Sequence, residues 1–169
     1  MNPDEHFMGL ALEQAKAALA AGEFPVGVVI VAEGAVVAEG RRQNSGGANP
    51  TELDHAEIVA IRRLLGRRPE IERGELTVYA TMEPCLMCYA ALLLNGVRRI
   101  VYAYEDAMGG ATSLPLIQLA PLYRQMALKV LVTPHVRRRE SLELFRHFFR
   151  QPDNLYWQGS LLAEYTLKQ

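Results

Sequence analysis

The sequence has little cysteine, no long apolar run and no excess of charge of one sign. Its two cysteines in 169 residues are too few to brace a secreted fold with disulfides. The apolar stretch Val26 to Ala32 is far shorter than the roughly 20 residues of a transmembrane helix. The acidic first residues, Met-Asn-Pro-Asp-Glu-His, lack the basic and apolar regions of a signal peptide. These absences predict a cytoplasmic protein with no membrane partner.

The charge of the whole chain neither requires nor excludes a polyanionic partner. Eighteen Lys and Arg stand against nineteen Asp and Glu, and the formal net charge is −1. The dense basic cluster Arg137 to Arg139 is followed directly by Glu140 and Glu143, which favours a solvated helix start over a nucleic-acid patch. Half of the residues are hydrophobic, and at roughly 100–200 residues per domain the length predicts one domain with a real core.

Apolar periodicity predicts strands that alternate with helices after an initial hairpin. Helices are expected over 8–19, 55–66, 85–94, 114–126 and 137–150, and strands over 26–32, 35–39, 76–81, 99–103 and 128–132. This order indicates a three-layer α/β/α sandwich around one five-stranded mixed sheet. We assign residues 1–152 to one domain and residues 153–169 to a tail that packs on it or on a partner subunit.

Two short motifs carry chemistry. His55-Ala-Glu57 begins a predicted helix after a loop, and Pro84-Cys85-Leu-Met-Cys88 begins another after a strand. Cysteines three residues apart lie on one helix face, so both thiolates can converge with the imidazole on one zinc ion and leave a coordination position open for water. Bound zinc lowers the pKa of its water toward about 7 and so supplies hydroxide at neutral pH. Glu57, two residues beyond the histidine ligand, is then placed to carry a proton rather than to bind metal.

Other interpretations of these motifs remain to be weighed. A Cys-x-x-Cys pair alone also fits a thiol redox protein, and His-x-Glu alone says almost nothing. A closed structural zinc site needs a fourth ligand, and His6, His135 and His147 lack ligand-like spacing. A catalytically silent zinc-binding interaction module is a remote alternative, disfavoured because Glu57 accompanies the three ligands. Together the motifs match the zinc-deaminase signature His-x-Glu…Pro-Cys-x-x-Cys.

The chain resembles the cytidine/deoxycytidylate deaminase superfamily, in the branch that holds bacterial tRNA adenosine deaminases and guanine deaminases. The resemblance runs from about residue 11 to residue 150 and rests on several motifs in the right order. These are Gly22-Glu-Phe-Pro-Val-Gly27, His55-Ala-Glu-Ile-Val-Ala-Ile-Arg62, Val78-Tyr-Ala-Thr-Met-Glu-Pro-Cys-Leu-Met-Cys88 and the stretch 140–149. It implies one zinc ion per chain between the second and third helices, parallel fourth and fifth strands, and a homodimer.

The resemblance also implies roles for single residues. By position, His55, Cys85 and Cys88 are the zinc ligands and Glu57 is the proton carrier. Asn44, eleven residues before the ligand histidine, stands where the family has a base-contacting asparagine, and Asp106 matches an aspartate in a loop that borders the substrate. The implied reaction is the hydrolytic removal, as ammonia, of an exocyclic amine from a nucleobase or nucleoside.

Departures from the tRNA-enzyme pattern bear on the substrate. The loop around Asp106 carries Glu105 and Met108 where basic side chains are usual, and the tail after Gln151 holds one lysine and two acidic residues. Since RNA binding depends on phosphate neutralisation, we expect a small nucleobase or nucleoside substrate and rank wobble adenosine of tRNA second. The tail aromatics Tyr156, Trp157 and Tyr165 either close over such a ligand or only pack on the core or on a partner subunit. The segment before the histidine motif also departs from the family, which usually has Asp-Pro-Thr-Ala where this chain has Asn49-Pro-Thr-Glu-Leu-Asp54. The sequence therefore does not predict the shape of the substrate loop.

Overall fold

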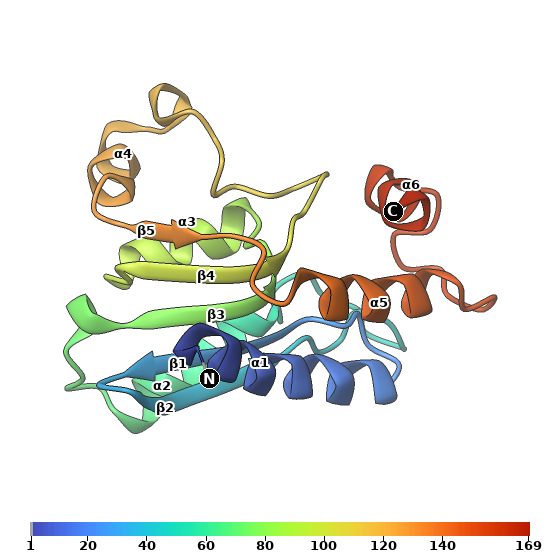
Figure 1. Cartoon of the computed structure of the whole chain (residues 1–169), viewed down its shortest axis with the longest axis horizontal. Coiled ribbons are helices and arrows are strands. Elements are labelled where there is room, and N and C mark those ends of the chain that lie inside the picture. Colours follow the sequence, from blue (N-terminus) through green and yellow to red (C-terminus); the bar gives the residue numbers. More distant parts are fainter. Residues whose placement is uncertain (1) are drawn as a thin grey trace.

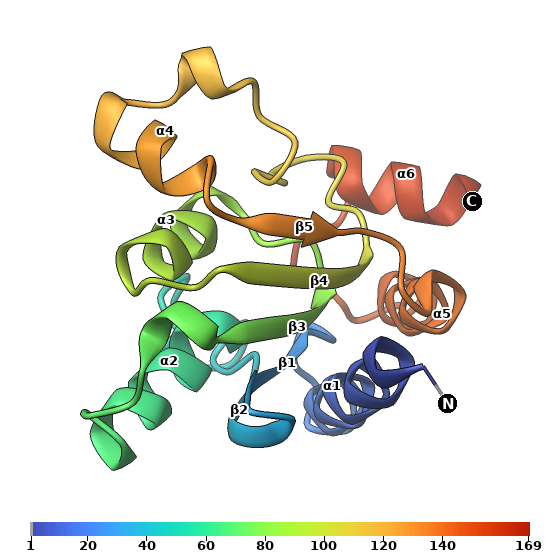
Figure 2. The ribbon, with the colours of Figure 1, turned by 60° about the vertical axis from the view of Figure 1, so that its left-hand side comes forward.

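A computed structural model describes residues 2–169. Its centre is one five-stranded sheet in the order β2-β1-β3-β4-β5, with helices on both faces (Figures 1 and 2). The strands are β1 (Gly27–Ala32), β2 (Ala35–Arg41), β3 (Thr77–Met82), β4 (Arg99–Tyr104) and β5 (Leu131–Thr133). The helices are α1 (Pro3–Ala20), α2 (Ala56–Arg67), α3 (Leu86–Leu94), α4 (Pro121–Ala127), α5 (Arg138–Phe149) and α6 (Leu161–Lys168).

The sheet is mixed, as expected. β1 pairs antiparallel with β2 and β3, whereas β3–β4 and β4–β5 are parallel. In Figure 2, α1 and α5 lie on one side of the sheet and α2 and α3 lie on the other. The predicted three-layer sandwich and the parallel pairing of the last two strands are both confirmed.

Alternation along β1 explains why the sheet is covered on both faces. Val28 and Ile30 belong to the larger hydrophobic cluster, whereas Val29 and Val31 belong to a second cluster that includes Leu12 of α1. Successive side chains of a strand point to opposite faces, so an unbroken apolar run needs a layer on each side. None of the helices in residues 2–169 combines the length and apolar character that crossing a bilayer requires.

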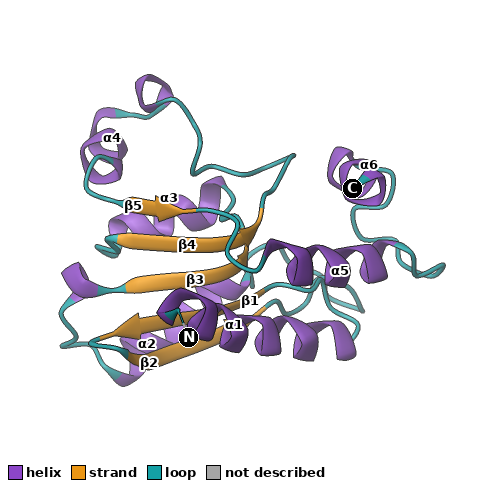
Figure 3. Ribbon diagram, in the orientation of Figure 1, coloured by secondary structure: helices purple, strands orange, loops and turns teal. Residues whose placement is uncertain are grey.

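The segment after β4 differs from the prediction. The single helix expected over 114–126 is wrong: a 3-10 turn, η2 (Leu116–Gln118), is separated from α4 by two non-helical residues, Leu119 and Ala120 (Figure 3). Pro121 explains the break, because it lacks an N–H and pushes the preceding residue, Ala120, out of the helical region. The fifth strand is also shorter and begins later than predicted.

The C-terminal tail contains a helix that the sequence pattern did not predict. Ser160 caps α6 by accepting a hydrogen bond from the backbone N–H of Ala163 at 3.2 Å. Leu162 and Thr166 of this helix are buried, and the Thr166 hydroxyl lies 3.0 Å from the hydroxyl of Tyr104 in β4. The tail therefore packs on the sheet domain of its own chain.

Candidate functional site

His55, Cys85 and Cys88 meet between two helix starts. His55 is the N-cap of α2, Cys85 is the N-cap of α3, and Cys88 lies in the first turn of α3. The ligand atoms of the three residues lie within 4.8 Å of one another, and His55 Nδ1 is 3.6 Å from Cys85 Sγ and 3.5 Å from Cys88 Sγ.

These separations fit a zinc ion. Zn–S distances of about 2.3 Å and Zn–N distances of about 2.0 Å put neighbouring tetrahedral ligands roughly 3.5–3.8 Å apart. One imidazole and two sulfurs are a donor set that zinc prefers. In the described residues no further His, Cys, Asp or Glu joins the group, which leaves the fourth position to water or substrate. The predicted zinc cofactor is thus supported by the geometry of this chain.

The electrostatics prepare the site for a cation. A hydrogen bond from Cys88 outweighs burial and, with a second from His55, lowers the pKa of Cys85 to about 4. Burial alone would lower the pKa of His55, but the hydrogen bond with Cys85 and the charge of Glu57 raise it to about 9. In the metal-free protein a thiolate therefore faces an imidazolium, and metal binding displaces the imidazolium proton.

Glu57 lies beside the ligands, in the first turn of α2, and its side chain is buried. Burial, reinforced by the negative charge of Cys85, raises its pKa to about 7. A carboxyl group with a pKa near neutrality exchanges protons in both directions at physiological pH. This property suits the predicted proton carrier.

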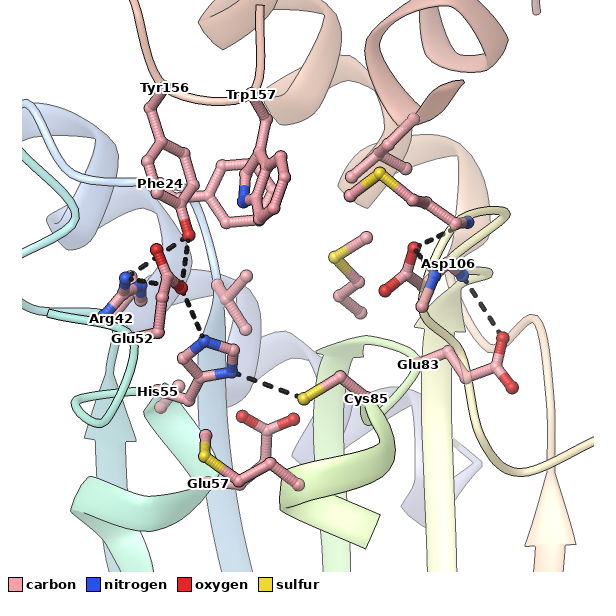
Figure 4. Close-up of a pocket in the computed structure, with 17 residues that line it drawn as sticks. Phe24, Arg42, Glu52, His55, Glu57, Glu83, Cys85, Asp106, Tyr156 and Trp157 are labelled. Carbon is pink, nitrogen blue, oxygen red and sulfur yellow. Dashed lines mark hydrogen bonds and ion pairs between the residues drawn. The ribbon is translucent and has the colours of Figure 1, made fainter. Parts of the chain in front are cut away.

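His55, Cys85 and Glu57 line a pocket of about 320 Å³ (Figure 4). Its walls are mostly apolar, and its size matches that of a small-molecule site. The other lining residues come from the loops before β1 and α2, the first turns of α2 and α3, the segments at the ends of β3 and β4, and the tail: Phe24, Val26, Arg42, Glu52, Ala56, Met82, Glu83, Met87, Asp106, Met108, Gly109, Tyr156, Trp157 and Leu162.

The two predicted substrate-binding residues are placed differently. Asp106 lines the pocket, and its Oδ1 accepts hydrogen bonds from the backbone N–H groups of Met108 and Gly109 at 3.0 and 2.9 Å. Asn44 does not line this pocket in the structure of residues 2–169. Its amide donates to Asp54 at 2.7 Å, and its positive φ of 53° shapes the loop before α2.

Residues outside the predicted site complete the pocket. Tyr156 and Trp157 of the tail line it, whereas Tyr165 does not and instead donates to Glu105 at 2.7 Å. Glu83 stands next to the cysteine motif in sequence and accepts from the backbone N–H groups of Asp106 and Thr112. Its position before Pro84 was a usable signal. Arg42 gave no signal, because its place depends on tertiary contacts.

Comparisons with known proteins agree with this site. The family model described as "Cytidine and deoxycytidylate deaminase zinc-binding region" matches residues 1–104. A tRNA-specific adenosine deaminase of Agrobacterium fabrum is 34% identical over 158 residues, covering 86% of this chain and 93% of that protein.

Two solved structures share the fold. A tRNA deaminase that edits adenosine to inosine at the wobble position is 32% identical, with a TM-score of 0.67, covering 82% of this chain and 98% of that one. Guanine deaminase from Nitrosomonas europaea is 22% identical, with a TM-score of 0.68 and coverage of 85% and 83%; at that identity it supports the fold alone. The chain, with its imidazole and two sulfurs gathered at two helix starts, belongs to the cytidine and deoxycytidylate deaminase family of zinc-binding proteins.

Proposed function

We propose that this chain is a zinc-dependent hydrolase that converts adenosine to inosine in a tRNA, with His55, Cys85 and Cys88 as metal ligands and Glu57 as proton carrier. The observation that carries the proposal is the 34% identity with a tRNA-specific adenosine deaminase across 93% of that protein's length. The similarity covers 86% of this chain and so extends well beyond the zinc-binding motifs, into the loops in which substrate preference resides.

The residues of the pocket divide the work of hydrolysis. A zinc ion held by His55, Cys85 and Cys88 supplies the Lewis acidity that activates water. Glu57 takes one proton of that water and delivers it to the ring nitrogen next to the amine-bearing carbon. It then carries the second proton of the same water to the amine, which leaves as ammonia. Burial of the Glu57 side chain raises its pKa, which favours uptake of a proton by this carboxylate. The apolar walls exclude bulk water, and Asp106 lies at the side opposite His55 (Figure 4).

The negative charge of Glu105, which would disfavour tRNA, is compensated within the chain. The acidic residue in the loop suggested repulsion of RNA phosphates. In the folded chain its carboxylate accepts from the Arg138 guanidinium and from the Tyr165 hydroxyl, so its charge is compensated. Met108 also stands where basic side chains are usual in tRNA adenosine deaminases, and its side chain lines the pocket. The order expected from sequence, with a free base ahead of tRNA, is therefore reversed in this proposal.

A free nucleobase or nucleoside is the second candidate. Tyr156 and Trp157 of the tail border a pocket whose volume suits a single base. In Figure 4 both rings lie on the side of the pocket opposite Glu57. Aromatic rings in this position close well over a small planar ligand. They also offer a stacking surface for a base that is flipped out of an RNA loop.

Ammonia release distinguishes the two candidates. The zinc-loaded protein is assayed with an anticodon stem-loop that carries the wobble adenosine, and with guanine, cytosine, adenosine and cytidine. We expect inosine in the stem-loop and at least tenfold lower turnover on the free compounds. A stem-loop with guanosine at the wobble position is the matched control. Turnover of a free base alone would replace the proposal by the second candidate, and no turnover of any member would contradict both.

A further inference from the structure

One carboxylate oxygen of Glu52 gathers three donor groups from distant parts of the chain. Its Oε2 lies 3.1 Å from His55 Nε2 and accepts from Arg42 Nη2 at 3.2 Å and from the Tyr156 hydroxyl at 2.9 Å. The histidine belongs to the metal centre, the arginine follows β2, and the tyrosine belongs to the tail. Figure 4 shows the three side chains pointing at the same carboxylate.

The two nitrogens of His55 face different partners. Nδ1 faces the sulfurs of Cys85 and Cys88, and Nε2 faces Glu52. A histidine that offers the Nδ1 lone pair to a metal carries its proton on Nε2, and that N–H then donates to the carboxylate. A carboxylate in this position fixes the tautomer and the ring orientation of the ligand and raises its basicity.

Glu52 is itself held in place. The Arg42 side chain is only 2% exposed, and it also donates to the backbone carbonyls of Gln43 at 2.6 Å and Thr51 at 2.8 Å. A cation this deeply buried requires a nearby anion, and the carboxylate that pairs with it is Glu52. Arg42 therefore fixes both the loop backbone and the carboxylate that the loop presents.

The third partner belongs to the tail that borders the pocket. The Tyr156 ring packs on Phe24 with 5.2 Å between ring centroids, and Arg42 Cζ lies 5.6 Å from its ring centroid. The hydroxyl of this packed ring then reaches Glu52. When the tail covers the pocket, one further hydrogen bond thus acts on the carboxylate behind the metal ligand.

We propose that Glu52 is a positioning residue for the metal ligand His55, and that Tyr156 connects the tail over the pocket to that ligand. The inference rests on the proposed zinc site. It assigns a purpose to the polar insertion before the histidine, which the motif itself does not require. It also makes metal affinity and tail position mutually dependent, since each stabilises the same carboxylate geometry.

Zinc affinity of the metal-free protein tests the proposal independently of turnover. Zinc dissociation constants are measured by competition with a chromophoric chelator for the wild type, E52Q, Y156F and the double variant. Removal of a carboxylate behind a histidine ligand weakens metal binding by about 10- to 100-fold. Glu52 is 58% exposed, so we expect E52Q to raise the constant by about tenfold, the lower end of that range. Y156F raises it less, and adds nothing in the E52Q background.

Two matched controls separate positioning from general destabilisation. Tyr165→Phe removes another tyrosine–glutamate hydrogen bond of the same tail, and Glu13→Gln neutralises an exposed glutamate paired with Lys16. Both should bind zinc like the wild type. Cobalt-substituted E52Q should show shifted visible absorption bands, because the imidazole orientation changes, whereas the cobalt spectra of both controls should not move.

The outcomes are distinct. Wild-type zinc affinity in E52Q overturns the inference and leaves the proposed function standing. If metal-free E52Q does not fold, Y156F decides, and an affinity equal to that of Tyr165→Phe overturns the inference. A wild-type chain that binds no zinc overturns the proposed function and this inference together.

Discussion

Carboxylates around one pocket differ in their work because their partners differ. Glu57 is buried beside a thiolate, and its pKa rises to about 7. Glu83 is just as buried, but it accepts from the backbone N–H groups of Asp106 and Thr112 and so holds a loop. Glu52 faces Arg42 and the imidazole of the ligand histidine. Environment divides chemically identical groups into a proton carrier, a loop anchor and a positioning group.

Glu57→Gln should abolish turnover while zinc is retained. The amide keeps the shape of the side chain but cannot take a proton, and loss of general acid–base catalysis costs about 10²–10⁴ in rate. Ammonia release and zinc content of the purified variant are the two measurements. Glu143→Gln, which alters an exposed glutamate of α5 paired with Arg146, is the control and should match the wild type. Activity of Glu57→Gln near the wild-type level would refute the role of this residue.

The sequence predicts those residues of the site whose contacts are local in the chain. Helical geometry predicts that Cys85 and Cys88 converge, whereas their meeting with His55 and Glu57 of another helix was predictable only from the match to the zinc-deaminase signature. The contact between Arg42 and Tyr156 was not predictable, because 114 residues separate them and only the packing of the tail brings them together. The spacing of residues along a helix predicts which of them share a face, but it does not predict which distant loop will contact that face.

At the scale of elements, close approach of helix and strand sets where the ligand histidine stands. A side chain added at Gly40 of β2 would meet backbone atoms of Ala56 and Ala60 in α2. The first turn of α2, with His55 as its N-cap, can thus lie directly on the sheet. A similar contact at Gly27 seats α1 on β1, where an added side chain would meet the backbone of Ala11.

Gly40→Ala should destabilise the fold by about 1–3 kcal/mol, because backbone atoms must shift to admit the methyl group. The free energy of unfolding from urea titration is the measurement. Gly66→Ala, in the helix α2 that Gly40 contacts, is the control. Nothing lies within 4 Å of its added methyl group, and we expect it to raise the free energy of unfolding by about 0.5–1 kcal/mol. Equal stability of the two variants would contradict the close approach.

The tail is attached to the sheet domain through Glu105, which follows β4. Burial would raise the pKa of this residue, but hydrogen bonds from Arg138 of α5 and Tyr165 of α6 lower it to about 2, against an ordinary value of 4.5. A carboxyl whose pKa is lower in the folded state contributes stability that is complete above about pH 4.5. That stability is lost as the pH falls toward 2.

Glu105→Gln should therefore lower the Tm at pH 7, and the difference from the wild type should shrink as the pH drops from 4.5 toward 2. Thermal unfolding at pH 7, 4.5 and 3 gives the comparison. Glu164→Gln, which removes only a surface pair with Lys168, should follow the wild type at every pH. A Tm difference between Glu105→Gln and the wild type that is constant with pH would show that ionisation of Glu105 is not its cause.

Element boundaries show the same limit of sequence reasoning. The strands β1 to β4 and the helices α1, α2, α3 and α5 follow apolar periodicity and were predictable. The segment before α4 was not, because Pro121 overrides a pattern that looks helical. Helix α6 has eight residues with an ordinary serine cap, and its burial against Tyr104 is what sustains it.

At the scale of the whole molecule, ion pairs engage half of the basic side chains. Nine of the eighteen Lys and Arg take part in ion pairs, and the basic cluster of α5 is partly neutralised through Arg137–Glu140 and Arg138–Glu105. Residues 1–40 carry one cation against six anions. Only part of the basic charge is thus available to the phosphates of an RNA partner, and we expect the pocket and its aromatic border to share in recognition.

Salt dependence measures this directly. Contacts to single-stranded RNA weaken with a slope of about −0.7 per neutralised phosphate in log–log terms, so about three contacts give a roughly 20-fold rise in KM from 50 to 200 mM salt. We expect a rise of this order for an anticodon stem-loop and a nearly flat response for any free base that is turned over. Steady-state ammonia release at four salt concentrations is sufficient. A KM for the stem-loop that is independent of salt would mean that the phosphates are not bound, and would favour the free base as the natural substrate.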